Sequence, residues 1–410
     1  MYFKIALRNI FKNARRSFIT ISAISVGYMA LALFAGYIES TKSALADQAI
    51  IGERLGHLTV IKKGYFEEGK LDPQHYVFSV EEIAKIRQLL AADPRIELVS
   101  PRLDISGLVS NGNISTIYFA EGVSPKDLVI LNEDYDVPGT LDLNNNGKGA
   151  FASQLAKLLA LKQGDTAAVI ATTADGLMNA MDIEIGDVYN TGSSGTNDKF
   201  ILLPYEFTQQ LYDVEGAHRL ILKLKDIGDI DEVRTALEQL FSDNKLSDNK
   251  LGLELKNWNE LSAFYNQVKN MLEGMFSFLF MLILVVVGMS ILNTMSMAVM
   301  ERTREIGTLR AVGVQRKGII KLFRYEGLII AVLGCLLGLV LTGLNTAAAH
   351  MLEVTYVPPG SSEAVPLTFL HLPENLIFYF VILVSIALFA SVMPAKRAAK
   401  MNLVDALGYA

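Results

Sequence analysis

The stretch Glu301–Val314, ERTREIGTLRAVGV, carries five charged residues among its first ten. Apolar segments flank it on both sides: 271–300 ends directly before it, and 328–344 follows soon after it. Charged side chains are costly inside the hydrocarbon core of a membrane, whereas long apolar helices are stable there. We therefore expect a short segment in water that connects two membrane-spanning helices.

Four apolar segments are long enough to cross a membrane, for which about 20 residues are needed. They are residues 17–38, 271–300, 318–348 and 376–394. Residues 39–270 are much more polar. The sequence therefore predicts an α-helical membrane protein with four transmembrane helices and a large α+β extracytoplasmic domain inserted between helices 1 and 2. A content of 51% hydrophobic and 20% charged residues agrees with this mixed architecture.

Basic residues concentrate in three short segments at the ends of the apolar ones. Residues 1–16, an amphipathic segment, contain five lysines and arginines and no acid, the loop 301–326 contains seven, and the tail 395–410 contains three. By the positive-inside rule, these segments and both chain termini are cytoplasmic, whereas 39–270 and the loop 349–375 lie outside. We expect a multi-pass protein of the bacterial cytoplasmic membrane. The acidic outer domain argues against a nucleic-acid partner.

The outer domain has the patterning of mixed helices and strands. Ser79 and Glu82 form a predicted capping box at the start of a helix over 79–92, and Asn111-Gly112 predicts a hairpin turn between two strands. Further predicted elements are a strand at 57–61, helices at 151–161 and 230–241, and a polar loop at 189–198 that could separate two subdomains. The domain contains no catalytic motif, and the chain no phosphate-binding loop or metal-ligand spacing, so we predict neither enzyme activity nor a metal site.

The charged stretch itself is predicted to be a helix over 301–313 with two different sides. The apolar side holds Ile306, Leu309 and Val312, and the other side holds the small residues Thr303, Gly307 and Ala311. Ion pairs are expected at a spacing of three residues, between Glu301 and Arg304 and between Arg302 and Glu305. On physical grounds alone, a simple anchoring loop with arginines near lipid headgroups explains the pattern as well as a docking helix does.

Three parts of the sequence resemble the FtsX-like permease family, the macrolide-exporter or mechanotransmission type of ABC transporter. The strongest resemblance is MERTREIGTLRAVGVQRKGI at 300–319. The segments 6–27 and 393–407 are similar to the ends of that family, although Leu403 replaces a proline that is usual there. The order of one span, a large outer domain and three spans also matches. The layout is closest to the transmembrane subunits of lipoprotein-releasing systems, which 56–66 also resembles, more weakly.

The resemblance implies that 301–317 is a coupling helix that docks on a separate cytoplasmic ATPase dimer. ATP and magnesium would be bound by that partner, so this chain would need no cofactor and would have no catalytic residue. The implied coupling residues are Glu301, Arg302, Arg304, Glu305, Ile306, Gly307, Leu309, Arg310, Val312 and Gly313. Spacing alone does not decide which face of the helix meets the ATPase.

Small and polar residues in the spans predict where helices pack together. Gly334 and Gly338 form a GxxxG pattern, which permits close approach of helices either within a bundle or between two chains. Polar residues near the end of the second span are expected inside a helix bundle; they are Ser290, Asn293, Thr294 and Ser296. Glu326 lies near the start of the third span and is expected to pair with a nearby arginine.

Together these expectations describe a permease subunit that transmits ATP-driven motion to its outer domain. Its substrate would be hydrophobic, such as a lipoprotein or a lipid, to be extracted or exported. Its expected partners are the ATPase dimer, a second permease chain (identical or related), membrane lipid and a periplasmic carrier or adaptor protein. The alternative hypothesis is a membrane scaffold that regulates an extracytoplasmic enzyme such as a cell-wall hydrolase.

Overall fold

The computed structural model describes residues 2–69, 72–132, 141–142, 145–244, 252–358 and 364–400. It divides into two compact units, which are described separately below. The helical unit comprises Met1–Ser43, Lys269–Tyr356 and Pro366–Ala410, and the α/β unit comprises Ala44–Val268 and Val357–Val365.

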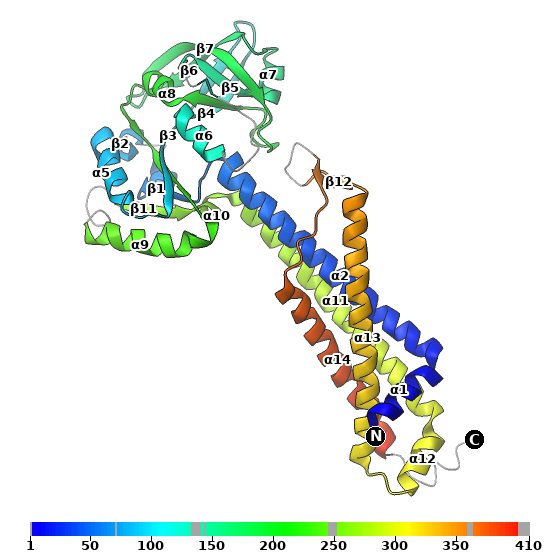
Figure 1. Cartoon of the computed structure of the whole chain (residues 1–410). Helices are drawn as coiled ribbons and strands as arrows, with labels where there is room; N and C mark the ends of the chain where they lie inside the picture. The colour runs from blue at the N-terminus through cyan, green and yellow to red at the C-terminus, as the bar shows by residue number, and fades with distance from the viewer. Residues whose placement is uncertain are drawn as a thin grey trace. The chain divides into compact units, whose positions relative to one another are not determined.

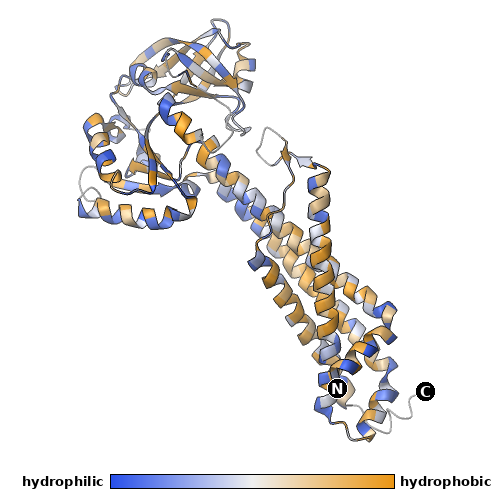
Figure 2. Cartoon of the chain, in the orientation of Figure 1, coloured by the Kyte–Doolittle hydropathy of each residue, from blue (hydrophilic) through white to orange (hydrophobic). Residues whose placement is uncertain are grey.

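Six helices make up the described part of the helical unit (Figure 1). They are α1 (Tyr2–Lys12), α2 (Ala14–Asp47), α11 (Ala263–Glu301), α12 (Thr303–Ala311), α13 (Arg316–Met351) and α14 (Pro373–Lys400), with the short strands β12 (Thr355–Tyr356) and β13 (Val365–Pro366) between the last two. Four of them, α2, α11, α13 and α14, are long and apolar enough to cross a membrane. Figure 2 shows that hydrophilic residues gather at the bundle end formed by α1 and α12.

The long helices extend beyond the predicted spans. With 39 residues, α11 starts at Ala263 instead of residue 271, and its length of about 58 Å exceeds a hydrocarbon core of about 30 Å. At the other end of the chain, α14 continues through Pro394 to Lys400. Part of the predicted C-terminal match, residues 401–407 with Leu403, lies outside the described residues.

The glycines of the GxxxG pattern pack against α2 of the same chain. A Cβ atom on Gly338 would lie 2.8 Å from both the Ser25 carbonyl oxygen and Tyr28 Cβ, and one on Gly334 would lie 2.7 Å from Ile24 Cβ. The Ser25 hydroxyl donates a hydrogen bond to the Gly334 carbonyl at 2.9 Å. Of the two alternatives left open by the sequence, the structure therefore shows a contact within the bundle.

The α/β unit combines one large sheet with short helices. Its strands are β1 (Leu58–Lys62), β2 (Phe78–Ser79), β3 (Ile96–Ser110), β4 (Ser115–Val123), β5 (Lys148–Ala152), β6 (Thr166–Thr172), β7 (Met178–Tyr189), β8 (Phe200–Pro204), β9 (Gly216–Ala217), β10 (Arg219–Leu224) and β11 (Leu253–Asn257). Its helices are η1 (Gln48–Gly52), α3 (Tyr65–Glu68), α4 (Pro73–Tyr76), α5 (Val80–Leu90), α6 (Pro125–Asn132), α7 (Ser153–Leu158), α8 (Tyr205–Tyr212), η2 (Ile227–Asp229), α9 (Ile230–Asp243) and α10 (Trp258–Leu261).

The nine-stranded sheet has the order β11-β1-β10-β3-β4-β8-β5-β7-β6, and β6 also pairs with β3. The six strands from β3 to β6 therefore close into a ring. One hydrophobic core fills this ring with α7 and α8, and a second core lies where α5 and α9 cover β1, β10 and β11. The long strand β3 belongs to both parts, because its first half pairs with β10 and its second half with β4 and β6.

Local sequence patterns predicted some elements of this unit correctly and others wrongly. The capping box of Ser79 and Glu82 is present at the start of α5, and Gly112, with a φ of 90°, lies in the turn between β3 and β4. The predicted helix at 151–161 is wrong at both ends, because Phe151 is a buried residue of β5 that pairs with Ile201, and α7 covers only Ser153–Leu158. The polar loop 189–198 joins β7 to β8 within one ring, so it separates no subdomains.

Candidate coupling site

The segment α12 is a short helix isolated by backbone breaks on both sides. Arg302 leaves helical geometry with φ −112° and ψ 19°, which separates α12 from α11. At the other end, Gly313 adopts a left-handed φ of 105°, a conformation that favours glycine and ends helices. The helix therefore covers Thr303–Ala311, fewer residues than the predicted 301–317, and Arg316 already begins α13.

One face of α12 packs into the bundle, and the other is exposed. Thr303, Ile306 and Gly307 are buried, and Ile306 with only 3% exposure belongs to the core of the helical unit. Val312, predicted on the same side as Ile306, is 82% exposed. The sequence pattern predicted both residues on one side of a helix. The helix ends at Ala311, however, so Val312 does not lie on the packed face.

Arg302 is the centre of a charged cluster that anchors α12. Its Nη1 lies 2.9 Å from Glu326 Oε1 on α13, and its Nε lies 2.9 Å from Glu305 Oε2. The side chains of Arg302 and Glu326 are nearly inaccessible to solvent. The predicted pair of Arg302 and Glu305 is thus confirmed, and the arginine expected near Glu326 is Arg302. Hydrogen bonds from Arg302 and Lys12 hold the pKa of Glu305 below its usual value.

The N-terminal helix α1 completes this cluster. Asn9 donates a hydrogen bond to Glu326, Lys12 Nζ lies 2.9 Å from Glu305 Oε1, and Arg16, just after α1, pairs with Glu301. The predicted pairing of Glu301 with Arg304 is therefore not formed, because Arg16 reaches Glu301 from α2. Ala6 on α1 is buried in the same core as α13. Sequence reasoning placed this helix at the same membrane side but gave no signal for its contacts.

The predicted coupling residues thus fall into two groups. Arg302, Ile306 and Gly307 are buried within the chain itself. The exposed group consists of Glu301, Arg304, Glu305, Val312 and Gly313, and Leu309 and Arg310 are partly exposed. A protein that docks on α12 would meet the second group, while the first group connects α12 to the bundle.

Polar residues on α11 are divided between the bundle and its surface. Thr294 Oγ1 lies 2.6 Å from Thr20 Oγ1 on α2, within hydrogen-bond distance. Ser290 and Ser296 are partly exposed. Asn293 is exposed, contrary to the expectation that it would lie inside the bundle. Spacing could not decide this, because α11 has the smallest buried share of the four candidate spans.

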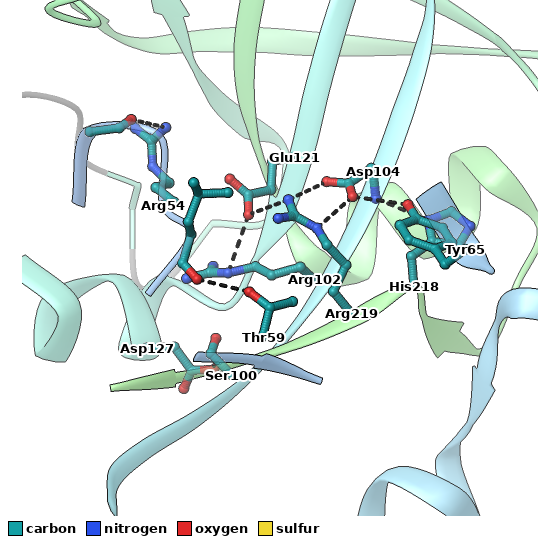
Figure 3. A network of polar contacts seen from close by, with 12 residues as sticks. Arg54, Thr59, Tyr65, Ser100, Arg102, Asp104, Glu121, Asp127, His218 and Arg219 are labelled. Carbon is teal, nitrogen blue, oxygen red and sulfur yellow. Dashed lines mark hydrogen bonds and ion pairs between the residues drawn. The ribbon is translucent and has the colours of Figure 1, made fainter. Parts of the chain in front are cut away.

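The α/β unit holds a second charged cluster, at the point where β3 changes partners (Figure 3). Arg219 on β10 lies 2.6 Å and 2.7 Å from the two oxygens of Asp104 on β3, and 3.3 Å from Glu121 Oε1 on β4. Burial alone would raise the pKa of Asp104, but the charge and hydrogen bonds of Arg219 hold it below its usual value. Arg219 therefore links three strands of the sheet.

Arg102 lies at the centre of this cluster with few partners of its own. It is 0% exposed, and its Nε lies 3.3 Å from Glu121 Oε1. Its three guanidinium nitrogens have no hydrogen-bond partner in the described part of the chain. Burial lowers the pKa of Arg102 to about 10, although the Glu121 charge opposes this shift. The carboxylate of Glu121 is thus the main negative charge that stabilises this fully buried cation.

Acid is expected to destabilise the α/β unit through His57. This side chain is buried, its Nδ1 accepts a hydrogen bond from the Leu224 N–H at 2.8 Å, and burial, reinforced by Lys223, lowers its pKa from 6.5 to about 4. The unfolded chain therefore binds more protons between these values, and stability falls as the pH falls from 6.5 toward 4.

Between pH 7 and pH 5 we expect the unfolding midpoint to fall by about 4–8 °C from this group. Fluorescence of Trp258, the single tryptophan of the chain, reports unfolding of the α/β unit. His57→Gln retains an acceptor for Leu224 and should reduce the change with pH. A midpoint that changes equally in both proteins would contradict this role of His57.

Comparison with known families identifies the class to which this architecture belongs. A model of the MacB-like periplasmic core domain matches residues 17–240, and a model of the FtsX-like permease C-terminal region matches residues 277–403. Four candidate spans with a large α/β periplasmic domain after the first are the layout of an ABC transporter permease. The chain belongs to the permease family that combines a MacB-like core domain with an FtsX-like C-terminal region.

Individual relatives match parts of the chain. The ABC transporter permease YtrF of Bacillus subtilis is 32% identical over 129 residues, covering 30% of this chain and 29% of YtrF. The macrolide export ATP-binding/permease protein MacB of Bdellovibrio bacteriovorus is 27% identical over 232 residues, 55% of this chain and 34% of that protein. The pyoverdine export ATP-binding/permease protein PvdT of Pseudomonas syringae pv. tomato is 27% identical over 212 residues, covering 52% of this chain and 30% of PvdT. The chain thus spans about a third of the length of these relatives.

Two solved structures resemble the chain more distantly. The extracellular domain of the ABC-type transporter YknZ from Gram-positive bacteria is 15% identical, with a TM-score of 0.34, over 49% of this chain and 99% of that one. The periplasmic region of MacB from Actinobacillus actinomycetemcomitans is 15% identical, with a TM-score of 0.36, over 52% of this chain and 94% of that one.

Proposed function

We propose that this permease transmits ATP-driven motion from a separate ATPase dimer, through α12, to its helix bundle and periplasmic domain. The chain termini and α12 are then cytoplasmic, in agreement with the basic residues at that end of the bundle. ATP and magnesium are bound by the ATPase, and this chain hydrolyses nothing. The motion extracts or exports a hydrophobic substrate such as a lipoprotein or a lipid.

The observation that carries the proposal is the two-sided character of α12. Its exposed side offers Arg304 and Glu305 to a partner, together with Val312 directly after the helix, while Arg302 directly before the helix is paired with Glu326 of α13. A force applied to the exposed side is therefore passed to a membrane-spanning helix through a short, nearly solvent-free ion pair. A loosely attached loop would lack that connection.

Two further features support the proposal. On the outside of the β ring, Leu108 lies opposite both Ile117 on β4 and Ile170 on β6, and Leu108, Ile117 and nearby Phe119 are exposed. Such an apolar sheet face suits a hydrophobic substrate or an adaptor protein. The first half of α11, where Met275, Phe278 and Met281 are exposed, suits a second permease chain, identical or related, packed beside it in the membrane.

Changing the exposed side of α12 should separate the permease from its ATPase. We expect the intact chain, purified from its native membrane, to retain a nucleotide-binding subunit and ATPase activity, and Arg304→Glu with Val312→Asp to lose at least about 90% of both. A buried contact centre that acquires like charges or unpaired acids loses several kcal/mol of binding free energy.

The control is Lys85→Glu, which makes the same charge reversal as Arg304→Glu at an exposed site on α5 of the other unit. This variant should retain the ATPase at the wild-type level. The coupling role is excluded if the wild-type chain captures no nucleotide-binding subunit, or if the α12 variant keeps full ATPase activity.

A further inference from the structure

A hollow of about 660 Å³ opens in the helical unit where α2 begins and α11 ends. Its walls include Lys12, Arg15 and Arg16 on one side and Ser290, Asn293 and Glu301 on the other. The three basic residues outnumber the one acid, so the hollow is positively charged. Nothing in the coupling role described above requires a cavity at this place.

Arg15 is the residue in this hollow that is ready to bind an anion. It is exposed, and its side chain makes no hydrogen bond or ion pair with the other residues that the structure describes. Arg16 uses one guanidinium nitrogen to pair with Glu301, but its Nη1 is buried and has no hydrogen-bond partner in the same described residues. Asn293 adds an exposed amide from the opposite wall. This group of donors is suited to a phosphate.

The position of the hollow fits the boundary between lipid headgroups and acyl chains. On α1, Phe3, Leu7 and Phe11 are exposed at a spacing of four residues, which forms the apolar stripe of a helix lying in the membrane interface. Ile19 and Met297 extend the charged hollow with exposed apolar walls.

An adjacent second hollow could take an acyl chain. It has about 650 Å³ and shares Ser290 and Asn293 with the first. Its other walls are mostly apolar and include Val286, Met289 and Met393. One polar hollow beside one apolar hollow matches the two parts of a phospholipid.

We propose that an anionic glycerophospholipid of the cytoplasmic leaflet binds here, with its phosphate at Arg15 and an acyl chain along α11. The site adjoins the pairs of Arg16 with Glu301 and of Lys12 with Glu305, so the bound phosphate lies beside the contacts that attach α2 to α11 and α1 to α12. A second copy of this chain is a poorer occupant, because a symmetric partner would bring the same excess of basic residues to the site.

The test compares lipid retention by the intact chain in nanodiscs of phosphatidylcholine with and without phosphatidylglycerol. Native mass spectrometry should find phosphatidylglycerol retained in preference to phosphatidylcholine on the wild-type chain. Arg15→Gln should reduce that preference about fivefold, the usual contribution of one basic residue near a membrane surface. Asn293→Leu should reduce it as well, without a change in charge.

Arg8→Gln is the matched control, because Arg8 is an exposed arginine on α1 that does not line the hollow. This variant should retain phosphatidylglycerol as the wild-type chain does. The site is excluded if Arg8→Gln and Arg15→Gln have equal effects, which would indicate general surface attraction. It is also excluded if Asn293→Cys cross-links two copies at the same rate in both lipid mixtures, which would indicate a protein occupant.

Discussion

Replacing Glu121 by glutamine is expected to lower the free energy of unfolding of the α/β unit by about 3–5 kcal/mol. The substitution preserves the shape of the side chain but removes the charge 3.3 Å from Arg102 Nε. Arg219 keeps both oxygens of Asp104 as partners, whereas Arg102 is left as a fully buried cation without a contacting anion. Urea unfolding of the intact chain, followed by Trp258 fluorescence, measures the change.

Two further variants distinguish charge burial from general damage. Glu184→Gln removes an acid from a solvent-exposed pair with Lys148 and should cost only about 0–1 kcal/mol. Adding Arg102→Met to Glu121→Gln removes the stranded cation and should restore part of the loss, since apolar replacements of buried ion pairs are often neutral. The assignment is wrong if Glu121→Gln and Glu184→Gln are equally mild.

The second large effect is expected from Glu326→Leu, which removes the acceptor for both Arg302 and Asn9. Arg302 is buried, so losing this partner should weaken the attachment of α12 by about 3 kcal/mol. Amide hydrogens of α12 should then exchange roughly 100-fold faster, because local opening becomes more frequent by that factor. Under the proposed function, ATPase activity would no longer drive transport, even though the exposed side of α12 is unchanged.

Lys12→Gln provides the comparison for this experiment. It removes a charge from the same cluster, but its pair with Glu305 is largely exposed, so exchange in α12 should change less than about fivefold. Adding Arg302→Leu to Glu326→Leu should slow the exchange again, because it removes a buried charge that Glu326→Leu leaves with only the half-exposed Glu305 as a partner. If Glu326→Leu leaves the exchange of α12 unchanged, the buried pair does not anchor that helix.

The sequence predicted the features that neighbouring residues determine and missed those that residues far apart in the chain form together. Local features were predictable: the Ser79 capping box, the turn at Gly112 and the pair of Arg302 with Glu305 all involve residues at most a few positions apart. The four spans were predictable for the same reason, since each is one continuous apolar segment. The outer ends of α2 and α11 were not predicted, because the polar residues beyond the apolar segments contain no pattern that shows where each helix ends.

Features made by distant residues could not be predicted. Glu301 pairs with Arg16 instead of Arg304 because α2 approaches it in space, and spacing on one helix contains no information about that. Phe151 looked helical from its neighbours, but its pairing with Ile201 makes it a strand residue. The GxxxG pattern identified Gly334 and Gly338 as contact positions, yet only the structure shows that the contact is with α2.

The packing of the N-terminal helices on α13 also has a consequence for synthesis in the cell. Asn9 and Glu326 are separated by 317 residues, and at about 5–20 residues per second a ribosome needs about 15–60 s to make the chain between them. Throughout that interval the first span lies in the bilayer without the glycine face that later covers Ser25 and Tyr28. Assembly of the bundle is therefore a late event, and the nascent first span must remain stable, and free of wrong partners, until α13 emerges.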